Sequence, residues 1–455
     1  MIVKMSTIVA ISTSPGIGGI GIIRMSGEAV FEILDKFFIP KTKSTIKGYT
    51  MKYGNIEDNN NIVDEVLVSY FTAPKSYTTE NMCEINSHGG IVVMNKILDI
   101  CLKNGAVLAE PGEFTKRAFL NGRIDLSQAE AVIDIINSKT EKESKVAIQQ
   151  LEGNLSEKIK QIRQEIISLL ADIEVTIDYP EYDVEEVSKS KISVVLEKVD
   201  KLLDELEKSF YNGKILREGV KVAIIGKPNA GKSSLLNLLL NEERAIVTDI
   251  EGTTRDSIEE FINIEGVPLK IIDTAGIRNA KDAVEKIGVE KSLKISEESD
   301  IILAIFDISK KLDEEDKKIL ELIKEKKSII ILNKNDLEKI LNLTEISDSG
   351  KPIIEMSAKN KNGVEHLYEE ISKMMKLNEI VVDGEIIVSN SRHKNIIINA
   401  RKNVKKSFDI IRQNLPIDII SSYLKEIIEE LGKITGESVT EDLLNEIFSK
   451  FCLGK

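Results

Sequence analysis

Hydrophobic positions follow a short period in the first part of this 455-residue chain. Apolar runs of strand length, separated by polar turns, predict β-strands. The expected strands cover residues 7–11, 19–24, 54–56, 63–71 and 82–86. A longer period predicts one helix over residues 28–38, capped by Ser26, and another over residues 91–103. Residues 1–121 are therefore expected to form an α+β domain.

The period lengthens after residue 121. Apolar residues three and four positions apart form two stripes, which predict amphipathic helices with charged outer faces. The stripes are Leu155, Ile159, Ile162, Ile166, Leu169 and Ile173, and then Ile192, Val195, Val199, Leu202 and Leu206. The helical pattern returns at 386–388 and from 394 to 450. Because the chain after about residue 377 is short for a separate domain, we expect the two helical parts to form one split helical bundle.

The segment between the two helical parts carries apolar runs, each followed by a polar motif. The first motif, 226–233, reads Gly-Lys-Pro-Asn-Ala-Gly-Lys-Ser and lies between a predicted strand and a predicted helix. Backbone N–H groups and the helix dipole at such a turn bind phosphate. Lys232 would reach the β- and γ-phosphates, and Ser233 would ligate magnesium.

Three more motifs follow, each at the carboxyl end of a predicted strand. Asp273-Thr274-Ala275-Gly276 offers a carboxylate for water-mediated magnesium binding and an N–H group for a γ-phosphate. Asn333-Lys334-Asn335-Asp336 ends in a carboxylate that can accept both N–H donors of a guanine edge. Ser357-Ala358-Lys359 fits a backbone contact to the guanine carbonyl. In this order, the four motifs resemble the GTPase branch of the P-loop NTPases, which implies an inserted Rossmann-like α/β domain.

Ile277 departs from the commonest GTPase pattern. Many GTPases place a glutamine directly after the Asp-x-x-Gly motif, where it orients the attacking water. Isoleucine cannot do this, so Glu285 and Arg278 are the candidates for that role. The alternative is a defunct hydrolase, which the intact magnesium and base motifs disfavour.

Composition and charge limit the partners. A formal net charge of −13 argues against a general polyanion binder, so any contact with nucleic acid must use a local patch. Cys83, Cys101 and Cys452 form no disulfide framework, which indicates a reducing compartment. No apolar run approaches the roughly 18 residues of a membrane span, and the N-terminus lacks a signal-peptide pattern. We therefore expect a cytoplasmic protein with no membrane partner.

Two further motifs are weaker. Residues 16–21 fit Gly-x-Gly-x-x-Gly, but a dinucleotide site needs a helix next, and β-branched Ile22 and Ile23 predict a strand. A tight glycine turn is the better interpretation. The C-terminal Cys452-Leu453-Gly454-Lys455 has the shape of a prenylation signal, although glycine and a terminal lysine fit it poorly. The alternatives for this tail are a disordered end and a reactive or docked segment.

Along essentially its whole length, the chain resembles the MnmE family, also called TrmE, of tRNA-modification GTPases. The matching stretches are 111–119, 125–131, 252–256 and the closing Cys-x-Gly-Lys. The resemblance implies a homodimer that works with the flavoprotein MnmG to add an aminomethyl or carboxymethylaminomethyl group at the 5-position of the tRNA wobble uridine. It also implies a folate-binding and dimerisation domain at 1–121, helical parts at 122–218 and 379–455, and a GTPase domain at 219–378.

The resemblance assigns roles residue by residue. GTP contacts fall on Asn229, Ala230, Gly231, Lys232, Ser233, Ser234, Thr248, Thr253, Thr254, Asp273, Thr274, Ala275, Gly276, Asn333, Lys334, Asp336, Ser357, Ala358 and Lys359. The implied magnesium ligands are Ser233 and Thr254, and the implied potassium ligands are Asn229, Thr248, Ile250 and Thr253. The implied catalytic residues are Lys232 and Glu285, and Glu285 would orient the attacking water through a second water molecule. The residues implied to bind 5-formyl- or 5,10-methylene-tetrahydrofolate are Arg24, Glu84, Arg123 and Lys455. Cys452 matches the cysteine of the family's C-terminal tail that is implicated in the modification.

The physics of phosphoryl transfer is consistent with these roles. Catalysis is mostly positioning and charge stabilisation, and the chain shows no obvious arginine finger. A potassium ion held by neutral oxygens would supply the missing cation, in a loop ordered when two GTPase domains meet. Two other classes stay open. The first is a ribosome-assembly GTPase, which would need a basic RNA-binding module. The second is a folate-dependent one-carbon transferase, which would itself catalyse the transfer and use its GTPase domain for regulation.

Overall fold

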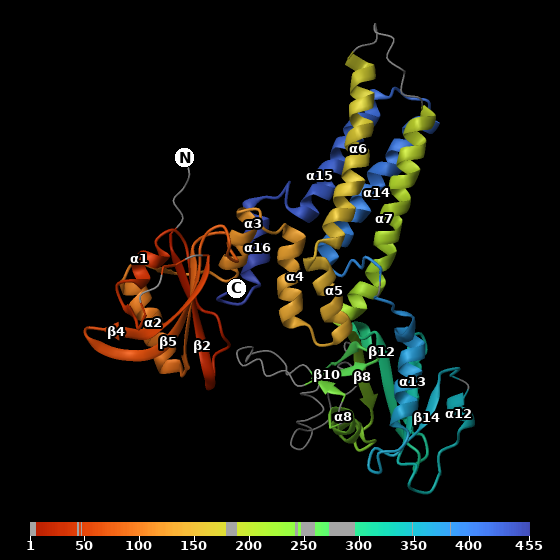
Figure 1. Cartoon of the computed structure of the whole chain (residues 1–455). Coiled ribbons are helices and arrows are strands. Elements are labelled where there is room, and N and C mark those ends of the chain that lie inside the picture. Colours follow the sequence, from red (N-terminus) through yellow and green to blue (C-terminus); the bar gives the residue numbers. More distant parts are fainter. Residues whose placement is uncertain are drawn as a thin grey trace. The chain divides into compact units, whose positions relative to one another are not determined.

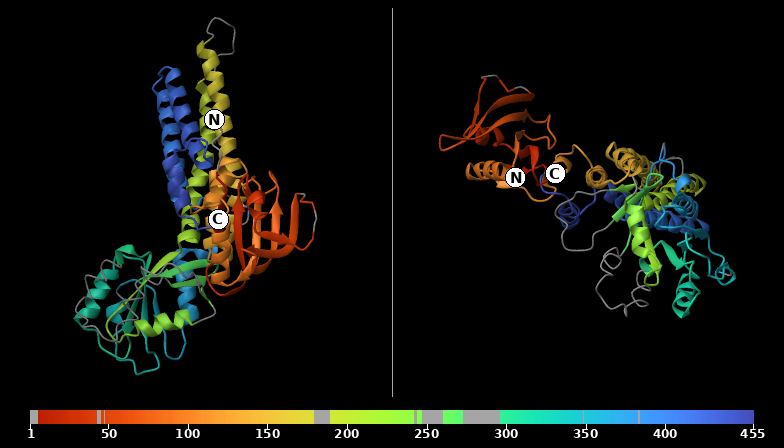
Figure 2. Two further views of the ribbon diagram at one scale, coloured as in Figure 1. Left: turned by 90° about the vertical axis from the view of Figure 1, so that its left-hand side faces the viewer. Right: turned by 90° about the horizontal axis from the view of Figure 1, so that it is seen from below.

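The structure is a computed structural model (Figures 1 and 2). It describes residues 6–42, 45–46, 48–178, 189–241, 244–246, 260–272, 296–347, 349–382 and 384–455. The chain divides into two compact units. The first comprises Met1–Ile133, Gln150–Val199 and Lys402–Lys455, and the second comprises Asp134–Gln149 and Asp200–Arg401. Among the described residues, no helix has the length and apolar character needed to cross a membrane.

A seven-stranded sheet forms the N-terminal part of the first unit, in the order β3-β4-β5-β6-β2-β1-β7. Its strands are β1 Ile8–Ile11, β2 Gly18–Ser26, β3 Phe38–Pro40, β4 Tyr49–Asp58, β5 Asn61–Phe71, β6 Met82–Gly89 and β7 Val107–Leu108. All neighbours are antiparallel except β1 and β7. Alternate strand residues such as Ile23, Val68 and Ile85 are buried together with residues of α1 (Val30–Leu34) and α2 (Ile91–Lys103).

The expected strands and the helix over 91–103 are confirmed, but the expected cap at Ser26 is wrong. Ser26 is the buried last residue of β2, and its hydroxyl oxygen lies 2.6 Å from that of Thr78 and 2.7 Å from a Glu80 carboxylate oxygen. The helix α1 starts later, at Val30, and is short because β3 follows at once. The glycine motif at 16–21 leads into a strand, as expected.

Long helices complete the first unit. They include α3 Glu113–Leu120, α4 Leu126–Asn137, α5 Glu141–Leu151, α6 Asn154–Asp178, α7 Lys189–Glu218, α14 Ser391–Arg412, α15 Asp418–Thr435 and α16 Glu441–Ser449, of which α4, α5, α7 and α14 continue into the second unit. The helix α6 packs against α15, and all six residues of the first expected stripe are buried. The segment 386–388, expected to be helical, has no helical structure.

The second expected stripe, on α7, is partly wrong. Ile192, Val199 and Leu206 are buried, but Val195 and Leu202 are only half-buried. The buried positions between them are the next residues, Leu196 and Leu203. Spacings of 3-4-3-4 and 4-3-4-3 both satisfy the helical period, so the pattern alone could not decide between them.

The second unit is built on another seven-stranded sheet, in the order β14-β13-β12-β8-β11-β10-β9. Its strands are β8 Val220–Gly226, β9 Ala245–Ile246, β10 Glu260–Ile264, β11 Val267–Ile271, β12 Ile301–Asp307, β13 Ser328–Asn333 and β14 Ile353–Glu355. The five strands from β14 to β11 are parallel, and β10 runs antiparallel to both of its neighbours. The sequence therefore predicted the α/β class of this unit correctly.

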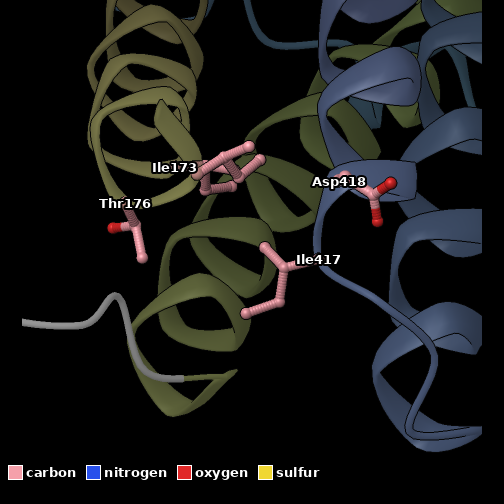
Figure 3. A pocket seen from close by; sticks show the side chains of 5 residues that line it. Ile173, Thr176, Ile417 and Asp418 are labelled. Carbon is pink, nitrogen blue, oxygen red and sulfur yellow. The ribbon is translucent and has the colours of Figure 1, made fainter. Parts of the chain in front are cut away.

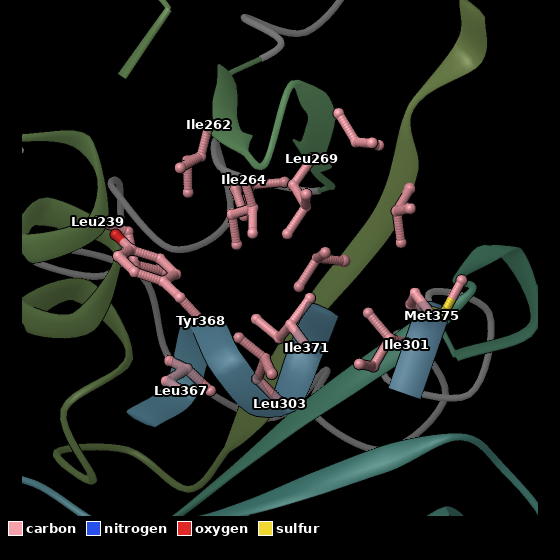
Figure 4. Close-up of a cluster of buried hydrophobic side chains, with 14 of the residues drawn as sticks. Leu239, Ile262, Ile264, Leu269, Ile301, Leu303, Leu367, Tyr368, Ile371 and Met375 are labelled. Carbon is pink, nitrogen blue, oxygen red and sulfur yellow. The ribbon is translucent and has the colours of Figure 1, made fainter. Parts of the chain in front are cut away.

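Helices cover both faces of this parallel sheet, so its strands are apolar on both sides. Odd-numbered residues of β12, such as Leu303, face a cluster with α8 (Lys232–Leu240) and α13 (Val364–Met375), part of which Figure 4 shows. Even-numbered residues, such as Phe306, face a cluster with α11 (Glu314–Ile323) and α12 (Thr344–Ser347). The 3₁₀-helix η1 (Leu377–Glu379) follows α13.

Candidate functional site

A sharp turn joins β8 to α8 at the carboxyl end of the second unit's parallel sheet. Asn229 and Gly231 in this turn have positive φ angles of 62° and 111°. Turns of this kind point successive N–H groups into the same space, and the N-terminus of α8 adds its dipole. Ser233 and Ser234 lie exposed in the first turn of the helix. The turn thus has the geometry of an anion cradle.

The side chain of Lys232 folds back over the turn. Its Nζ donates to the carbonyl oxygens of Gly226 at 2.6 Å and Lys227 at 2.8 Å. An ammonium group has three N–H donors, so two such bonds fix both its position and its direction. The cation is held beside the N–H groups of the turn, where the charge of a phosphate would lie.

Asn333, at the end of β13, joins three of the sequence motifs. It is buried, and its Nδ2 donates to the Ala230 carbonyl at 2.9 Å. Its Oδ1 accepts from the Ala358 backbone N–H at 3.0 Å. Because parallel strands end at the same edge of a sheet, motifs more than 100 positions apart along the chain are brought into direct contact here.

Asp336 lies at the exposed rim of this cluster. The Ser357 hydroxyl donates to its Oδ1 at 2.6 Å, and this hydrogen bond holds the pKa of Asp336 below its ordinary value. The carboxylate is therefore ionised at neutral pH and oriented by a buried serine. Lys334 has a φ of 67° and donates from Nζ to Asp307 at 2.6 Å. The motif thus presents one fixed acceptor at the rim, while its lysine is paired inside.

Part of the expected nucleotide site lies outside the described residues. This holds for Thr248, Ile250, Thr253, Thr254, Asp273, Thr274, Ala275, Gly276 and Glu285, and for Ile277 and Arg278. The described portion consists of the phosphate turn and the two motifs on the base side.

A second cluster lies in the first unit, on the sheet of the N-terminal part. Arg24 and Glu84 are cross-strand partners in β2 and β6. The Nε and Nη2 of Arg24 donate to one Glu84 oxygen at 2.9 and 2.7 Å. The Arg24 guanidinium lies 5.7 Å from the centre of the Tyr77 ring, and that of Arg123 lies 4.5 Å from the same ring. Arg24 and Arg123, far apart in sequence, therefore both lie against Tyr77, and Glu84 joins them through its ion pair with Arg24.

The C-terminal tail is docked at this cluster. The Gly454 carbonyl accepts from Arg24 Nη1 at 3.2 Å and from the Ser12 hydroxyl at 3.0 Å. Burial and the nearby Arg24 cation lower the pKa of Lys455. Gly454 has a φ of 87°, and a Cβ there would come 2.4 Å from a backbone oxygen, so this position requires glycine. The docked tail, one of the alternatives from the sequence, is the one that the structure supports.

Comparison with known proteins places the chain in a family. A family model for the MnmE helical domain matches residues 126–452, and one for the GTP-binding protein TrmE N-terminus matches residues 7–123. The curated tRNA modification GTPase MnmE of Acetivibrio thermocellus is 51% identical over 457 residues, covering 99% of this chain and 100% of the relative. The chain belongs to the MnmE family. A relative with the same printed name in Clostridioides difficile is 50% identical, and the match covers 99% of each chain. Another in Finegoldia magna is 49% identical, and the match covers 98% of this chain and 99% of the relative.

The G domain of the T. maritima FeoB iron transporter shares 25% sequence identity over 34% of this chain and 98% of its own, with a TM-score of 0.26. The MnmE relatives, in contrast, match over nearly the full length of both chains. Both clusters described above therefore lie within the part of the chain that the family shares.

Some residues of the two clusters carry no motif signal in the sequence. Tyr77 sits in a polar loop, and its hydroxyl lies 2.9 Å from that of Thr115. Asp307, the partner of Lys334, ends the apolar strand β12. The rule that polar residues at the carboxyl ends of parallel strands gather at one site could have found Asp307. Nothing in the sequence pattern marks Tyr77.

A cavity in the helical part of the first unit has a different character. It has a volume of about 330 Å³, and Figure 3 shows its position between α6 and the start of α15. Its lining is mostly isoleucine, with one carboxylate, and consists of Ile173, Thr176, Ile177, Ile417 and Asp418. None of these five lining side chains carries the positive charge that would pair with a phosphate or a folate carboxylate.

Proposed function

We propose that this chain hydrolyses GTP and uses that reaction to modify the wobble uridine of tRNA. It would act as a cytoplasmic homodimer with the flavoprotein MnmG, installing an aminomethyl or carboxymethylaminomethyl group at the 5-position. The observation that carries the proposal is the pair of hydrogen bonds by which Asn333 joins the phosphate turn to the base-side motifs. The printed name of the relatives, tRNA modification GTPase, supports the biological role, and free thiols at all three cysteines support the compartment.

Asp336 supports guanine as the base. An ionised carboxylate with fixed orientation accepts hydrogen bonds and donates none. The Watson–Crick edge of guanine carries two adjacent N–H donors, whereas adenine presents an acceptor at the corresponding ring nitrogen. The buried Ser357 keeps the carboxylate aimed at the rim before nucleotide arrives, so little ordering is needed on binding.

The phosphate side fits two cations. Magnesium would be held by Ser233 and Thr254 and would neutralise charge on the phosphates. Ser233 is exposed in the first turn of α8, where its hydroxyl can reach a metal beside the phosphate cradle. We further propose a potassium site formed by oxygens of Asn229, Thr248, Ile250 and Thr253. Asn229 is exposed in the turn, with the backbone bent to a positive φ, and this geometry fits a side-chain oxygen ligand there.

The remaining residues of the site would hold the phosphates and the base or orient the attacking water. Lys232, anchored by two carbonyl oxygens, would stabilise negative charge as the γ-phosphoryl group leaves. The segment 273–276 would bind the γ-phosphate and the magnesium shell, and Glu285 would orient the attacking water through a second water. Lys334, Ser357, Ala358 and Lys359 would complete the base site, and Ala230, Gly231 and Ser234 the phosphate cradle.

We propose that the cluster around Tyr77 binds a tetrahydrofolate derivative through Arg24, Glu84, Arg123 and Lys455. Folate has a pterin edge rich in N–H donors and a glutamate tail with two carboxylates, so one carboxylate and three cations fit its chemistry. The docked tail supports this assignment because Lys455 lies close enough to Arg24, Glu84 and Cys452 for their charges to act on its pKa. The proposed divisions are a folate domain at 1–121, helical parts at 122–218 and 379–455, and a GTPase domain at 219–378.

Mass spectrometry of tRNA from a deletion strain tests the biological role. The modified wobble uridines should disappear, return with the wild-type chain, and stay absent with Lys232→Ala. Hydrolysis by the purified chain tests the potassium site, since potassium should raise kcat at least about tenfold over sodium at equal ionic strength. Unchanged wobble uridines in the deletion strain would reject the role in tRNA, and equal rates in the two salts would reject the potassium site.

A further inference from the structure

The side chain of Lys227 leads away from the phosphate turn to which its backbone belongs. Its Nζ lies 2.7 Å from a carboxylate oxygen of Asp313 and 2.5 Å from one of Asp316. The side chain of Lys227 is 15% exposed and that of Asp316 only 5%. A cation and a carboxylate that are removed from water to this extent interact more strongly than a surface pair, because solvent screens them less.

The two acidic partners are themselves held rigidly. Asp313 is the N-cap of α11, and its side chain accepts from the N–H groups of Glu315 and Asp316 at 3.0 and 3.1 Å. The Asp316 side chain in turn accepts from the Asp313 N–H at 3.1 Å, which completes a capping box. Since α11 packs on the apolar face of the sheet through residues such as Ile323, the helix that carries this anchor is fixed to the core.

The other end of Lys227 touches the catalytic lysine. The Lys227 carbonyl is one of the two oxygens that accept from Lys232 Nζ. A continuous set of contacts therefore runs from the start of α11 through the side chain and backbone of Lys227 to the ammonium of Lys232. Sliding the Lys227 backbone by a fraction of an ångström would redirect the ammonium that meets the phosphates.

We infer that Lys227 is a positioning residue that holds Lys232 in its phosphate-binding orientation by anchoring the phosphate turn to Asp313 and Asp316. This role rests on the proposed use of the turn for nucleotide, but it does not depend on potassium, folate or tRNA. The side chain of Lys227 would not touch the nucleotide. Lys227 acts through the direction of its own carbonyl group, so its effect must vanish when Lys232 is absent.

Nucleotide affinity of the full chain, measured with a fluorescent GDP analogue, tests this dependence. Lys227→Ala should weaken binding at least tenfold in the wild-type background and less than twofold in a Lys232→Ala background, because coupled residues are not additive. Lys227→Arg should keep affinity within about threefold, since it restores the charge. An equal loss in both backgrounds, or no loss in the wild-type background, would overturn the role.

Two controls separate positioning from general destabilisation. Lys324→Ala removes an exposed ion pair with Glu321 at the other end of α11 and should leave affinity unchanged. Asp316→Asn should mimic Lys227→Ala in affinity if the anchor acts through this carboxylate, and wild-type affinity in that variant would contradict the anchor. If the wild-type chain bound GDP but did not hydrolyse GTP, the proposed function would fail while the affinity comparison still decided the role of Lys227.

Discussion

Replacing Glu143 with glutamine should remove a pH dependence of stability in the second unit. Glu143 lies in the first turn of α5, is 6% exposed, and accepts a hydrogen bond from the Lys139 N–H at 2.7 Å. Burial raises its pKa from the ordinary value of 4.5 to about 7, although the hydrogen bond and charge of Lys139 oppose the change. The nearby Asp134 carboxylate, which is paired with Arg217, adds to the rise.

The sign of the effect follows from proton linkage. A pKa raised by folding means that the folded state holds its proton more tightly than the unfolded state. The resulting stability is complete below about pH 4.5 and is lost as the pH rises through about 7. A rise of about 2.5 pKa units corresponds to at most about 3.5 kcal/mol of opening free energy, at about 1.4 kcal/mol per unit. Glutamine keeps the shape and hydrogen bonding of the neutral acid but cannot ionise.

Hydrogen exchange of the α5 amides in the full chain measures the opening free energy of this helix alone. The measurement does not require the multidomain chain to unfold in a single two-state transition. After correction for intrinsic exchange rates, the opening free energy of wild-type α5 should fall by up to about 2.5 kcal/mol between pH 5 and 8, while that of Glu143→Gln should stay nearly level. The exposed Glu141→Gln on the same helix is the matched control and should follow the wild type. Parallel pH profiles for wild type and Glu143→Gln would refute the reasoning.

Other variants test the two clusters. Asp336→Asn should weaken GTP binding and favour xanthosine triphosphate, because the donor and acceptor pattern inverts; unchanged GTP affinity would mean that the base binds elsewhere. Gly231→Ala should cut GDP affinity at least tenfold with unchanged circular dichroism, because its Cβ would come 2.0 Å from Asn333 Nδ2 at a φ of 111°; normal affinity would contradict the close packing of the turn. Glu285→Ala should slow single-turnover hydrolysis without changing affinity, and an unchanged rate would reassign the water-orienting role. Deleting 452–455 should weaken calorimetric binding of 5-formyltetrahydrofolate and spare GTP hydrolysis, whereas equal folate binding would remove the tail from the pocket.

The sequence predicted the cores well because burial leaves a periodic signal. In β12 and β13 every residue is buried, so a continuous apolar run marks each strand and a polar residue marks its end. The polar residue at the end of each run is therefore enough to locate Asn333 and its neighbours from the sequence alone. The α7 stripe shows the limit of the method. A helical wheel with apolar residues at both Val195 and Leu196 fits two orientations, and the choice depends on the elements that pack against it.

The Lys227 anchor left no signal in the sequence, and the docked tail was expected only as an alternative and through the family resemblance, because both depend on side chains that meet only after folding. Lys227 and Asp313 are separated by 86 positions, and Ser12 and Gly454 by 442. The Gly-x-x-x-x-Gly-Lys-Ser pattern specifies the residues that shape the turn and face phosphate. Lys227 occupies one of its unspecified x positions, so neither the motif nor a hydrophobic period indicates its partners. Those partners are set by strand order, which places the start of α11 beside the turn after β8. A motif therefore specifies which atoms meet the ligand, whereas the groups that aim those atoms are determined by the topology of the sheet.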